Sequence, residues 1–426
     1  MDFWPRGRRR RAWASAAAAA ALLGLAACGA SSPEPSGSGG ARQTIVFAES
    51  GLGAEEQQTQ QAVDGFERAH PDIHVKLAVL SPNSTRYLSQ LEHSFTVGSA
   101  TPDVFESDVT YPPKFARAGW ALDLRRFSPD MKRYLAREAA FGTHKGGVYA
   151  IPWFDNPEGL YYRADLIKTP PASPAQVVAD AKAAMKRDSS ITAGLAFEGA
   201  EYEGAITAFQ TVESAFGGKL KTSDIDTAGN VAALAWLQDA IYKNHIAPAD
   251  VIGWHESQVA REFVSGHAAF AIDYPFVEEM ATRSPVRGKV GYMPFPAGPG
   301  GTPGSALGGE MLALNAKSAH AAAAWQLIQY LTSQKVEIRR AEATGDPPSL
   351  AGAYTQALYA EAPYLKDVRT LGSYAQPRPV NPDYLTVSHD LQVMLAQVFA
   401  NATSPTKALS GAAPAIRKDG NINTPP

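Results

Sequence analysis

The segment TIVFAESGLGAEEQQTQQAVDGFERAHPDIHVKLAV, residues 44–79, decides the fold class because its hydrophobic period changes twice. Residues 44–47 form a short β-rich run. Residues 55–70 repeat apolar side chains at helical spacing until Pro71 stops them, and residues 73–77 alternate like a strand. Strand, helix and strand in this order favour a parallel or mixed sheet with helices on its faces.

The alternation continues along the chain. Residues 87–95 repeat apolar side chains at helical spacing and residues 103–105 are strand-like again, which completes a βαβαβ order. In the second half, residues 231–241 and 321–331 each predict a helix. Residues 288–309 between them are rich in glycine and proline and indicate a strand with loops.

Composition indicates a globular protein outside the nucleic-acid-binding class. Of the 426 residues, 45% are apolar and 19% are charged. Beyond residue 27, 34 basic and 41 acidic residues give a net charge of −7, whereas a nucleic-acid footprint would be basic. This part of the chain has 399 residues, which is long for one hydrophobic core, so we expect two lobes.

The N-terminal segment predicts export and a lipid anchor. Five arginines precede an apolar stretch, residues 12–27, whose 16 residues are short for a membrane span. The tetrapeptide Leu-Ala-Ala-Cys that ends at Cys28 resembles the lipobox of bacterial lipoproteins. This resemblance implies a signal peptide over residues 1–27, lipidation of Cys28 and a flexible linker over residues 28–41. The alternative for this lone cysteine is a buried free thiol.

Motifs that carry catalysis are absent from the sequence, with one candidate left open. The chain has no Gly-x-Ser-x-Gly elbow, no Gly-x-x-x-x-Gly-Lys loop and no His-Glu-x-x-His metal site. Glu198, Glu201 and Glu203 cluster along the chain, and paired carboxylates such as the last two could hydrolyse a glycosidic bond. Acids in the first turn of a helix also complement its dipole.

Three segments combine polar side chains with aromatic rings or an arginine: residues 152–156, 273–276 and 377–379. A sugar presents C–H faces that stack on flat rings and hydroxyl groups that need donors and acceptors. The segments therefore suit a sugar site. Aromatic residues beside proline also serve as core or loop anchors, so both interpretations stay open.

A resemblance to a known family runs in order over nearly the whole chain after residue 41. It is carried by PDVFESD at 102–108, FARAGW at 115–120, GVYAIPW at 147–153, GLYYRADL at 159–166, EGAEYEG at 198–204, FVSGHAAF at 263–270, the glycine pair at 308–309 and Pro-Arg-Pro at 377–379. These stretches resemble the family 1 extracellular solute-binding proteins, the sugar-binding lipoproteins of bacterial ABC importers. Within that family, the chain is most similar to the trehalose/maltose-binding branch.

The resemblance implies an α/β fold of the two-lobed, type II periplasmic-binding-protein kind. The implied N-lobe is 42–151 plus 273–332, and the implied C-lobe is 152–272 plus 333–426. A disaccharide, trehalose or maltose-like, would bind between the lobes, hinge closure would bury it, and an ABC transporter permease would receive it. Such a protein is no enzyme, needs no cofactor or metal, binds no nucleic acid, faces the extracytoplasmic side on its lipid anchor and is expected to be a monomer.

The resemblance also implies ligand contacts, position by position. Asp108 would accept hydrogen bonds from sugar hydroxyls, Tyr274 and Phe276 would stack on or flank the sugar, and Arg378 would reach it. The other implied contacts are Asn156, Asp155, Gly309, Tyr202, Glu55 and Arg86. The alternatives are helix capping by Asp108, core packing of the aromatic pair and a rim salt bridge of Arg378.

Two positions depart from the family pattern. Glu310 follows the glycine pair where relatives can carry an aromatic residue, and Phe154 stands where a tyrosine platform is expected, so the stacking face stays and the hydroxyl is lost. Glu310 would add an acceptor to the pocket or form a buried salt bridge. The sugar's identity stays open, and the alternatives are a lipid-anchored glycoside hydrolase and a sensory or scaffold lipoprotein.

Overall fold

The computed structural model describes residues 42–51 and 54–421, and the structural statements below concern these residues. The predicted signal peptide, the lipidation site Cys28 and nearly all of the predicted linker lie outside them. Among the described residues, no helix is long and apolar enough to cross a membrane.

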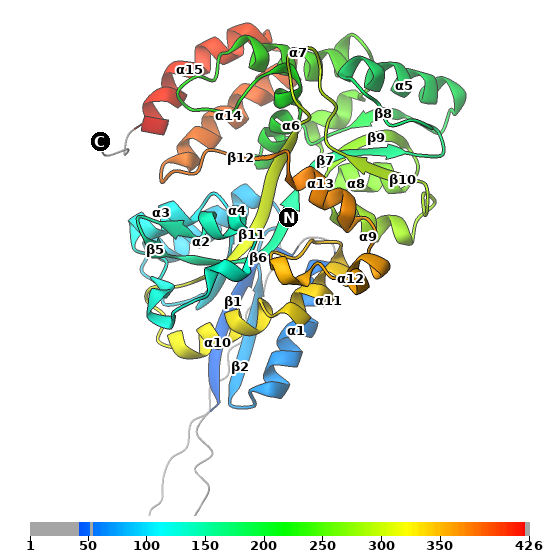
Figure 1. The fold of residues 1–426 in the computed structure, drawn as a ribbon. Coiled ribbons are helices and arrows are strands. Elements are labelled where there is room, and N and C mark those ends of the chain that lie inside the picture. The colour runs from blue at the N-terminus through cyan, green and yellow to red at the C-terminus, as the bar shows by residue number, and fades with distance from the viewer. Residues whose placement is uncertain (1–41, 52–53, 422–426) are drawn as a thin grey trace, which may run out of the picture. The chain divides into compact units, whose positions relative to one another are not determined.

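The first of two large sheets forms around the segment that decides the fold (Figure 1). Its strands, in spatial order, are β12 (Ala375–Pro377), β11 (Ser305–Leu314), β3 (Val104–Asp108), β1 (Gln43–Glu49) and β2 (Ile73–Val79), with β6 (Ala150–Pro157) paired to β11. β1 runs parallel to β2 and β3, whereas β11 is antiparallel to β3 and β6. The prediction of a parallel or mixed sheet is confirmed.

Helices with one apolar face cover this sheet. α1 buries Ala62, Val63 and Phe66, which join Phe47 of β1 in one core. The helices around the first sheet are α1 (Glu55–Ala69), α2 (Ser84–Thr96), α3 (Pro112–Ala118), α4 (Ala136–Phe141), α10 (Ala321–Leu331) and α11 (Gln334–Thr344). Short elements beside them are η1 (Leu124–Phe127), η2 (Met131–Arg133), β4 (Thr143–His144), β5 (Gly147–Val148) and η5 (Ala351–Ala353). The predicted helices near residues 55–70, 87–95 and 321–331 are confirmed.

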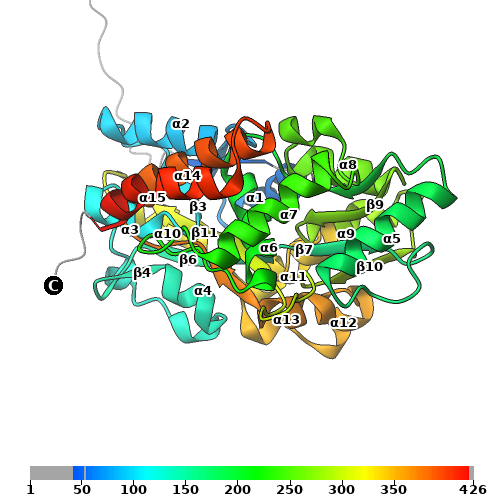
Figure 2. The ribbon, with the colours of Figure 1, turned by 90° about the horizontal axis from the view of Figure 1, so that it is seen from above.

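The second sheet has its own hydrophobic core, which makes the fold two-lobed. Its strands, in spatial order, are β10 (Val290–Met293), β7 (Gly159–Arg163), β9 (Ala268–Asp273) and β8 (Ala193–Ala196). Its helices are α5 (Pro174–Arg187), α6 (Glu203–Glu213), α7 (Ala228–Tyr242), α8 (Glu256–Val264), α9 (Phe276–Thr282), α14 (Tyr384–Phe399) and α15 (Pro405–Asn421), with η3 (Ser214–Phe216) and η4 (Ala249–Gly253). Figure 2 shows α14 and α15 beside α6 and α7, with which they are in contact.

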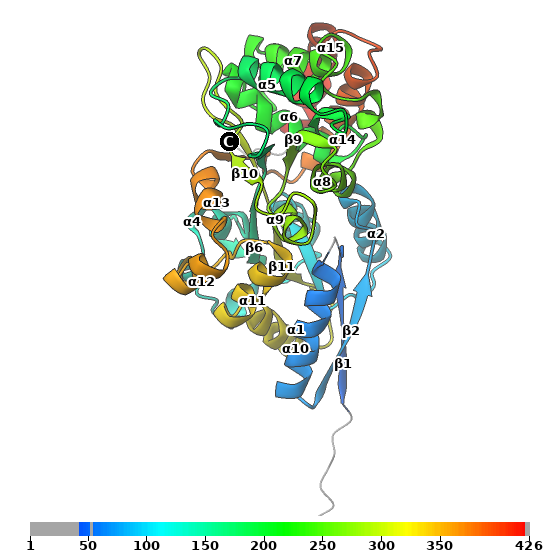
Figure 3. The ribbon, with the colours of Figure 1, turned by 90° about the vertical axis from the view of Figure 1, so that its right-hand side faces the viewer.

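The strands also indicate where the chain passes between lobes (Figure 3). β6 in the first sheet is followed by β7 in the second, and Glu158 is the residue between them. β10 pairs with β7 although it falls inside the predicted N-lobe segment 273–332, because its backbone hydrogen bonds go to the second sheet. α12 (Gln356–Glu361), α13 (Leu365–Gly372) and β12 then precede the last two helices. We therefore propose crossings at Glu158, between β10 and β11, and after β12, in place of residues 151, 272 and 332.

Candidate functional site

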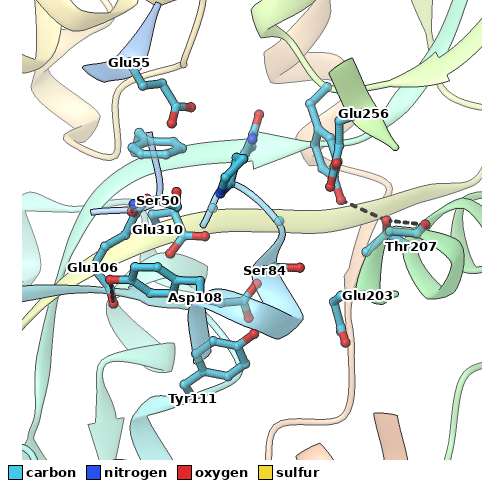
Figure 4. Close-up of a pocket in the computed structure, with 18 of the residues that line it drawn as sticks. Ser50, Glu55, Ser84, Glu106, Asp108, Tyr111, Glu203, Thr207, Glu256 and Glu310 are labelled. Carbon is cyan, nitrogen blue, oxygen red and sulfur yellow. Dashed lines mark hydrogen bonds between the residues drawn. The ribbon is translucent and has the colours of Figure 1, made fainter. Parts of the chain in front are cut away.

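A pocket lies at the carboxyl ends of β1 and β3, where ligands bind in open α/β sheets, and it receives residues from both lobes. From elements of the first lobe it is lined by Ser50, Glu55, Pro82, Ser84, Tyr87, Glu106, Asp108, Tyr111, Phe154, Asn156, Gly308, Gly309 and Glu310. The remaining lining residues are Glu203, Gly204, Thr207, Glu256, Tyr274 and Arg378. Figure 4 shows Glu55, Glu106, Asp108 and Glu310 on one side and Glu203, Thr207 and Glu256 on the other.

Most of the predicted ligand contacts meet in this one pocket. Those that line it are Asp108, Asn156, Phe154, Tyr274, Gly309, Glu310, Arg378 and Glu55. They come from β3, β6, β11, α1 and two loops, which are far apart in the sequence. Their convergence makes the pocket the candidate site, and their contact with a ligand stays a prediction.

Arg378 joins the two sides of the pocket. Its Nη2 donates to Oδ2 of Asp108 at 2.7 Å, and its Nη1 donates to Oε1 of Glu203 at 2.7 Å. The side chain is 2% exposed, so this contact is a buried bridge rather than a salt bridge on the rim. Burial alone would lower the pKa of Arg378, but the two carboxylates raise it well above its ordinary value. Arg378 therefore stays charged and ties β3 to α6.

Glu203 is held by the structure on several sides. Besides Arg378, its carboxylate accepts hydrogen bonds from Tyr384 at 2.5 Å and from Ser388, both on α14. Glu201, its partner in the glycosidase interpretation, is exposed and does not line the pocket. The carboxylate pair required for hydrolysis is therefore not assembled at this pocket.

Glu310 differs from Glu203 because it has no hydrogen-bond or ion-pair partner among the described residues. It lies opposite Asp108 in the register of β11 and β3, and Glu106 shares the same face of β3 because strand side chains alternate. Burial raises the pKa of the Glu310 carboxyl well above its ordinary value, and the charges of Glu106 and Asp108 raise it further. The buried salt bridge considered for Glu310 is not formed with any of the described residues.

The glycine pair allows β11 to approach β6 closely. Gly309 has φ of +126°, and a Cβ there would lie 2.8 Å from the carbonyl oxygen of Phe154. A Cβ on Gly308 would lie 2.9 Å from the carbonyl oxygen of Asn156. Both positions therefore require glycine to keep the strands in contact beneath the pocket.

Two aromatic rings line the pocket, and contacts with neighbouring side chains hold them in place. The guanidinium of Arg340 lies 4.3 Å from the ring centroid of Phe154 and 4.1 Å from that of Trp153. The hydroxyl of Tyr274 is hydrogen-bonded to Oγ1 of Thr207 at 2.9 Å. A flat ligand face can therefore meet rings whose positions are already set.

Two predicted contacts face away from the pocket for simple geometric reasons. Asp155 lies between Phe154 and Asn156 on a strand, so it points to the opposite face, where it is buried and paired with Arg137. Phe276 begins α9 and packs in the second-lobe core. Core packing, the alternative named for the aromatic pair, applies to Phe276, whereas Tyr274 packs against the same core and also lines the pocket.

Tyr202 and Arg86 also lie outside the pocket lining. Tyr202 is buried, and its hydroxyl accepts a hydrogen bond from the backbone N–H of Glu256 at 3.2 Å. It therefore positions a residue that does line the pocket. Arg86 is exposed in the first turn of α2, and its positive charge helps to lower the pKa of His255, which burial lowers most.

Several pocket residues were missed from the sequence. Glu106 could have been found, because it lies two residues before Asp108 on the same strand and must share its face. Glu256 gave no such signal, because only the fold brings the start of α8 to the pocket. Burial raises its pKa to about 7. Tyr87 was counted only as an apolar position of the helix predicted at residues 87–95, and Tyr111 was not singled out; both serve the core and the pocket.

The pocket has the composition of an organic-ligand site. No group of three or more His, Cys, Asp or Glu side chains in residues 42–51 and 54–421 is arranged to hold a metal ion. Two lobes that share one polar and aromatic pocket at their junction define a ligand-binding protein of the two-lobed α/β class.

Comparison with known proteins gives the family. Residues 51–338 match the model of the bacterial extracellular solute-binding protein family, and the chain belongs to that family. A probable ABC transporter-binding protein of Deinococcus radiodurans is 28% identical over 395 residues, which cover 86% of this chain and 91% of that protein. The family resemblance predicted from the sequence is confirmed.

Solved structures agree on the fold. Maltose-bound MalE3 of T. maritima superposes with a TM-score of 0.84 at 28% identity, covering 88% of this chain and 99% of that one. The GacH receptor of Streptomyces glaucescens superposes with a TM-score of 0.81 at 24% identity, covering 88% and 98% of the two chains. The predicted two-lobed fold is therefore confirmed.

Proposed function

We propose that the protein is the substrate-binding component of an ABC sugar importer and captures a disaccharide, trehalose or maltose-like, in the pocket between its lobes. The observation that carries this proposal is a single pocket lined by carboxylates, an amide, an arginine and aromatic rings from both lobes. Family membership and the similarity to a maltose-bound protein support it.

Several pocket residues have polar atoms or ring faces that can contact a sugar. Oδ1 of Asn156 is buried and has no hydrogen-bond partner among the described residues, so it is available to accept from a sugar hydroxyl. Nε of Arg378 is also buried and unpaired, so one donor stays available beside its two ion pairs. Phe154 and Tyr274 offer faces to the C–H side of a sugar ring.

Binding would act by lobe closure. A sugar that touches β3, β6 and β11 on one side and α6 and α8 on the other has more contacts when the lobes are closed, so it favours that state. A permease that recognises the closed shape would then receive the ligand. No bond of the sugar needs to break, and we propose that the protein is not an enzyme.

The predicted N-terminal features complete this proposal. A lipid on Cys28 and a linker over residues 28–41 would hold a monomeric binding protein on the extracytoplasmic side of the membrane. Tethering raises its effective concentration at a membrane-bound permease.

Calorimetric titration of the purified protein with trehalose, maltose and monosaccharides tests the proposal. We expect heat from at least one disaccharide and no released monosaccharide after incubation. In Asn156→Ala, the affinity should fall about tenfold, the equivalent of one hydrogen bond, while the melting temperature stays unchanged. Asn244→Ala, which removes a partly exposed amide outside the pocket whose oxygen accepts from Lys182, is the matched control. Absence of binding by every sugar would overturn the proposal.

A further inference from the structure

The pocket contains many more carboxylates than cations. Its acidic lining residues are Glu55, Glu106, Asp108, Glu203, Glu256 and Glu310, and its only basic lining residue among those described is Arg378. Arg378 already forms ion pairs with Asp108 and Glu203. A neutral disaccharide needs acceptors for its hydroxyls, but it brings no positive charge to balance this excess of carboxyl groups.

The excess is concentrated on one face of the first sheet. Glu310 and Asp108 are directly opposite on antiparallel strands, and Glu106 is the next residue on that face. Like charges directly opposite across strands destabilise a sheet. Figure 4 shows Glu106, Asp108 and Glu310 together on the same side of the pocket.

A second guanidinium, that of Arg340, does not pair with Glu310. Arg340 lies 3.1 Å from a carboxylate oxygen of Asp346 and 3.8 Å from one of Glu55. It is also stacked over Phe154. Its charge is therefore shared by carboxylates other than Glu310, which has no ion pair in the described structure.

Aromatic rings complete an environment suited to a cation. Phe154 and Tyr274 line the same pocket as Glu310, and an ammonium group is attracted both to carboxylates and to the faces of aromatic rings. Resting on the function proposed above, we propose that the ligand is an amino-substituted sugar whose protonated amine lies against Glu310 and Asp108. The other hydroxyls of the sugar would meet Asn156 and the second-lobe side of the pocket.

The direct test compares matched ligands. Trehalose and maltose would be titrated beside the same disaccharides with one hydroxyl replaced by an amine, at each ring position, and beside the N-acetylated amines, which carry no charge. At about pH 6.5, where a primary amine is protonated, we expect one amine to bind at least tenfold tighter than both uncharged partners. This ratio should fall as salt is added, because salt screens the ion pair.

Glu310→Gln tests where the amine lies. This substitution keeps the shape and removes the group that can ionise, so the amine should lose its advantage over the neutral sugar. Glu56→Gln is the matched control, because Glu56 is exposed beside Glu55 and does not line the pocket. If Glu310→Gln does not fold, the ligand comparison with the unaltered protein still decides.

The outcomes separate the two proposals. Binding of a neutral disaccharide with equal or weaker binding of every amine would overturn the amino-sugar inference and leave the sugar-binding function intact. Binding of no ligand in the panel would overturn both. A preferred amine whose advantage survives in Glu310→Gln would overturn its placement at Glu310.

Discussion

On the α6 side of the pocket, Glu203 accepts hydrogen bonds from Arg378, Tyr384 and Ser388, whereas on the β11 side Glu310 has no such partner among the described residues. Hydrogen bonds to charged groups stabilise a fold by about 1.5–3 kcal/mol each. The α6 side therefore stabilises the structure, and the β11 side keeps a carboxyl group that no described protein group occupies. This difference separates the carboxylates of one acidic pocket that the fold uses from those that we propose are available to a ligand.

The largest expected effect comes from removing the bridge between the two sides. Arg378→Met leaves Asp108 and Glu203 without their shared cation in a buried position, and breaking a buried pair costs about 3–5 kcal/mol. We expect urea unfolding to show a loss of that size, together with loss of ligand binding.

Arg117→Met is the matched control for Arg378. Arg117 also forms a two-nitrogen contact with a carboxylate, that of Asp383, but its side chain is 39% exposed. Exposed pairs contribute about 0–1 kcal/mol. Equal losses in the two variants would mean that burial of the Arg378 bridge is not what stabilises the pocket.

The next effect concerns the backbone beneath the β11 side. Gly309→Ala places a Cβ at 2.8 Å from the carbonyl oxygen of Phe154 at φ of +126°, and such strain costs up to about 3 kcal/mol. Gly146→Ala has φ of +78° with no atom within 4 Å of the added Cβ, so it should cost only about 1 kcal/mol. Thermal unfolding of both variants measures the difference, and equal costs would rule out the close strand approach as its cause.

A smaller effect distinguishes the carboxylates by pH. Burial and neighbouring charges raise the pKa of Glu310 above its ordinary value of 4.5, so the folded protein holds a proton there that the unfolded chain releases. Stability from this group is present below pH 4.5 and is lost as the pH rises, by at most about 1.4 kcal/mol per pH unit. Urea unfolding at a series of pH values gives the slope of the free energy of unfolding against pH. In Glu310→Gln, the part of this slope that comes from Glu310 should disappear.

Glu203→Gln, which removes a charge that the fold uses, should behave in the opposite way. Its carboxylate accepts from Arg378, so loss of the negative charge should lower stability at neutral pH. If Glu310→Gln and Glu203→Gln changed the free energy of unfolding in the same direction, the distinction drawn between the two sides of the pocket would be wrong.

The fold was predictable because it follows from local patterns. The period change over residues 44–79 identifies β1, α1 and β2, and the apolar positions of α1 are the buried ones. The strands that join the lobes were harder to assign, because β10 and β11 lie close together in the sequence and pair with different sheets. The assignment of β10 and β11 to different lobes depends on hydrogen bonds between residues that are far apart in the sequence.

The site was predictable where motifs mark strand ends, and less so elsewhere. Asp108, Asn156 and Arg378 meet as the family pattern implies, and Glu310, a departure from that pattern, lines the same pocket. Asp155 was included as a neighbour, although strand alternation turns it away. Glu256 was missed because nothing near it in the sequence indicates that Tyr202 fixes it at the pocket.

The smallest expected effect reports whether the two lobes face each other across this pocket. Arg86 on α2 belongs to the first lobe, and His255 precedes α8 in the second. The positive charge of Arg86 lowers the pKa of His255, after the larger effect of burial. In Arg86→Ala, the pKa of His255 followed by NMR should therefore rise, while Arg68→Ala in the last turn of α1 should leave it unchanged. If the proposed closure brings α2 and α8 together, a bound sugar should enlarge the difference between the two variants. An unchanged His255 in Arg86→Ala would mean that α2 and α8 do not approach each other in solution.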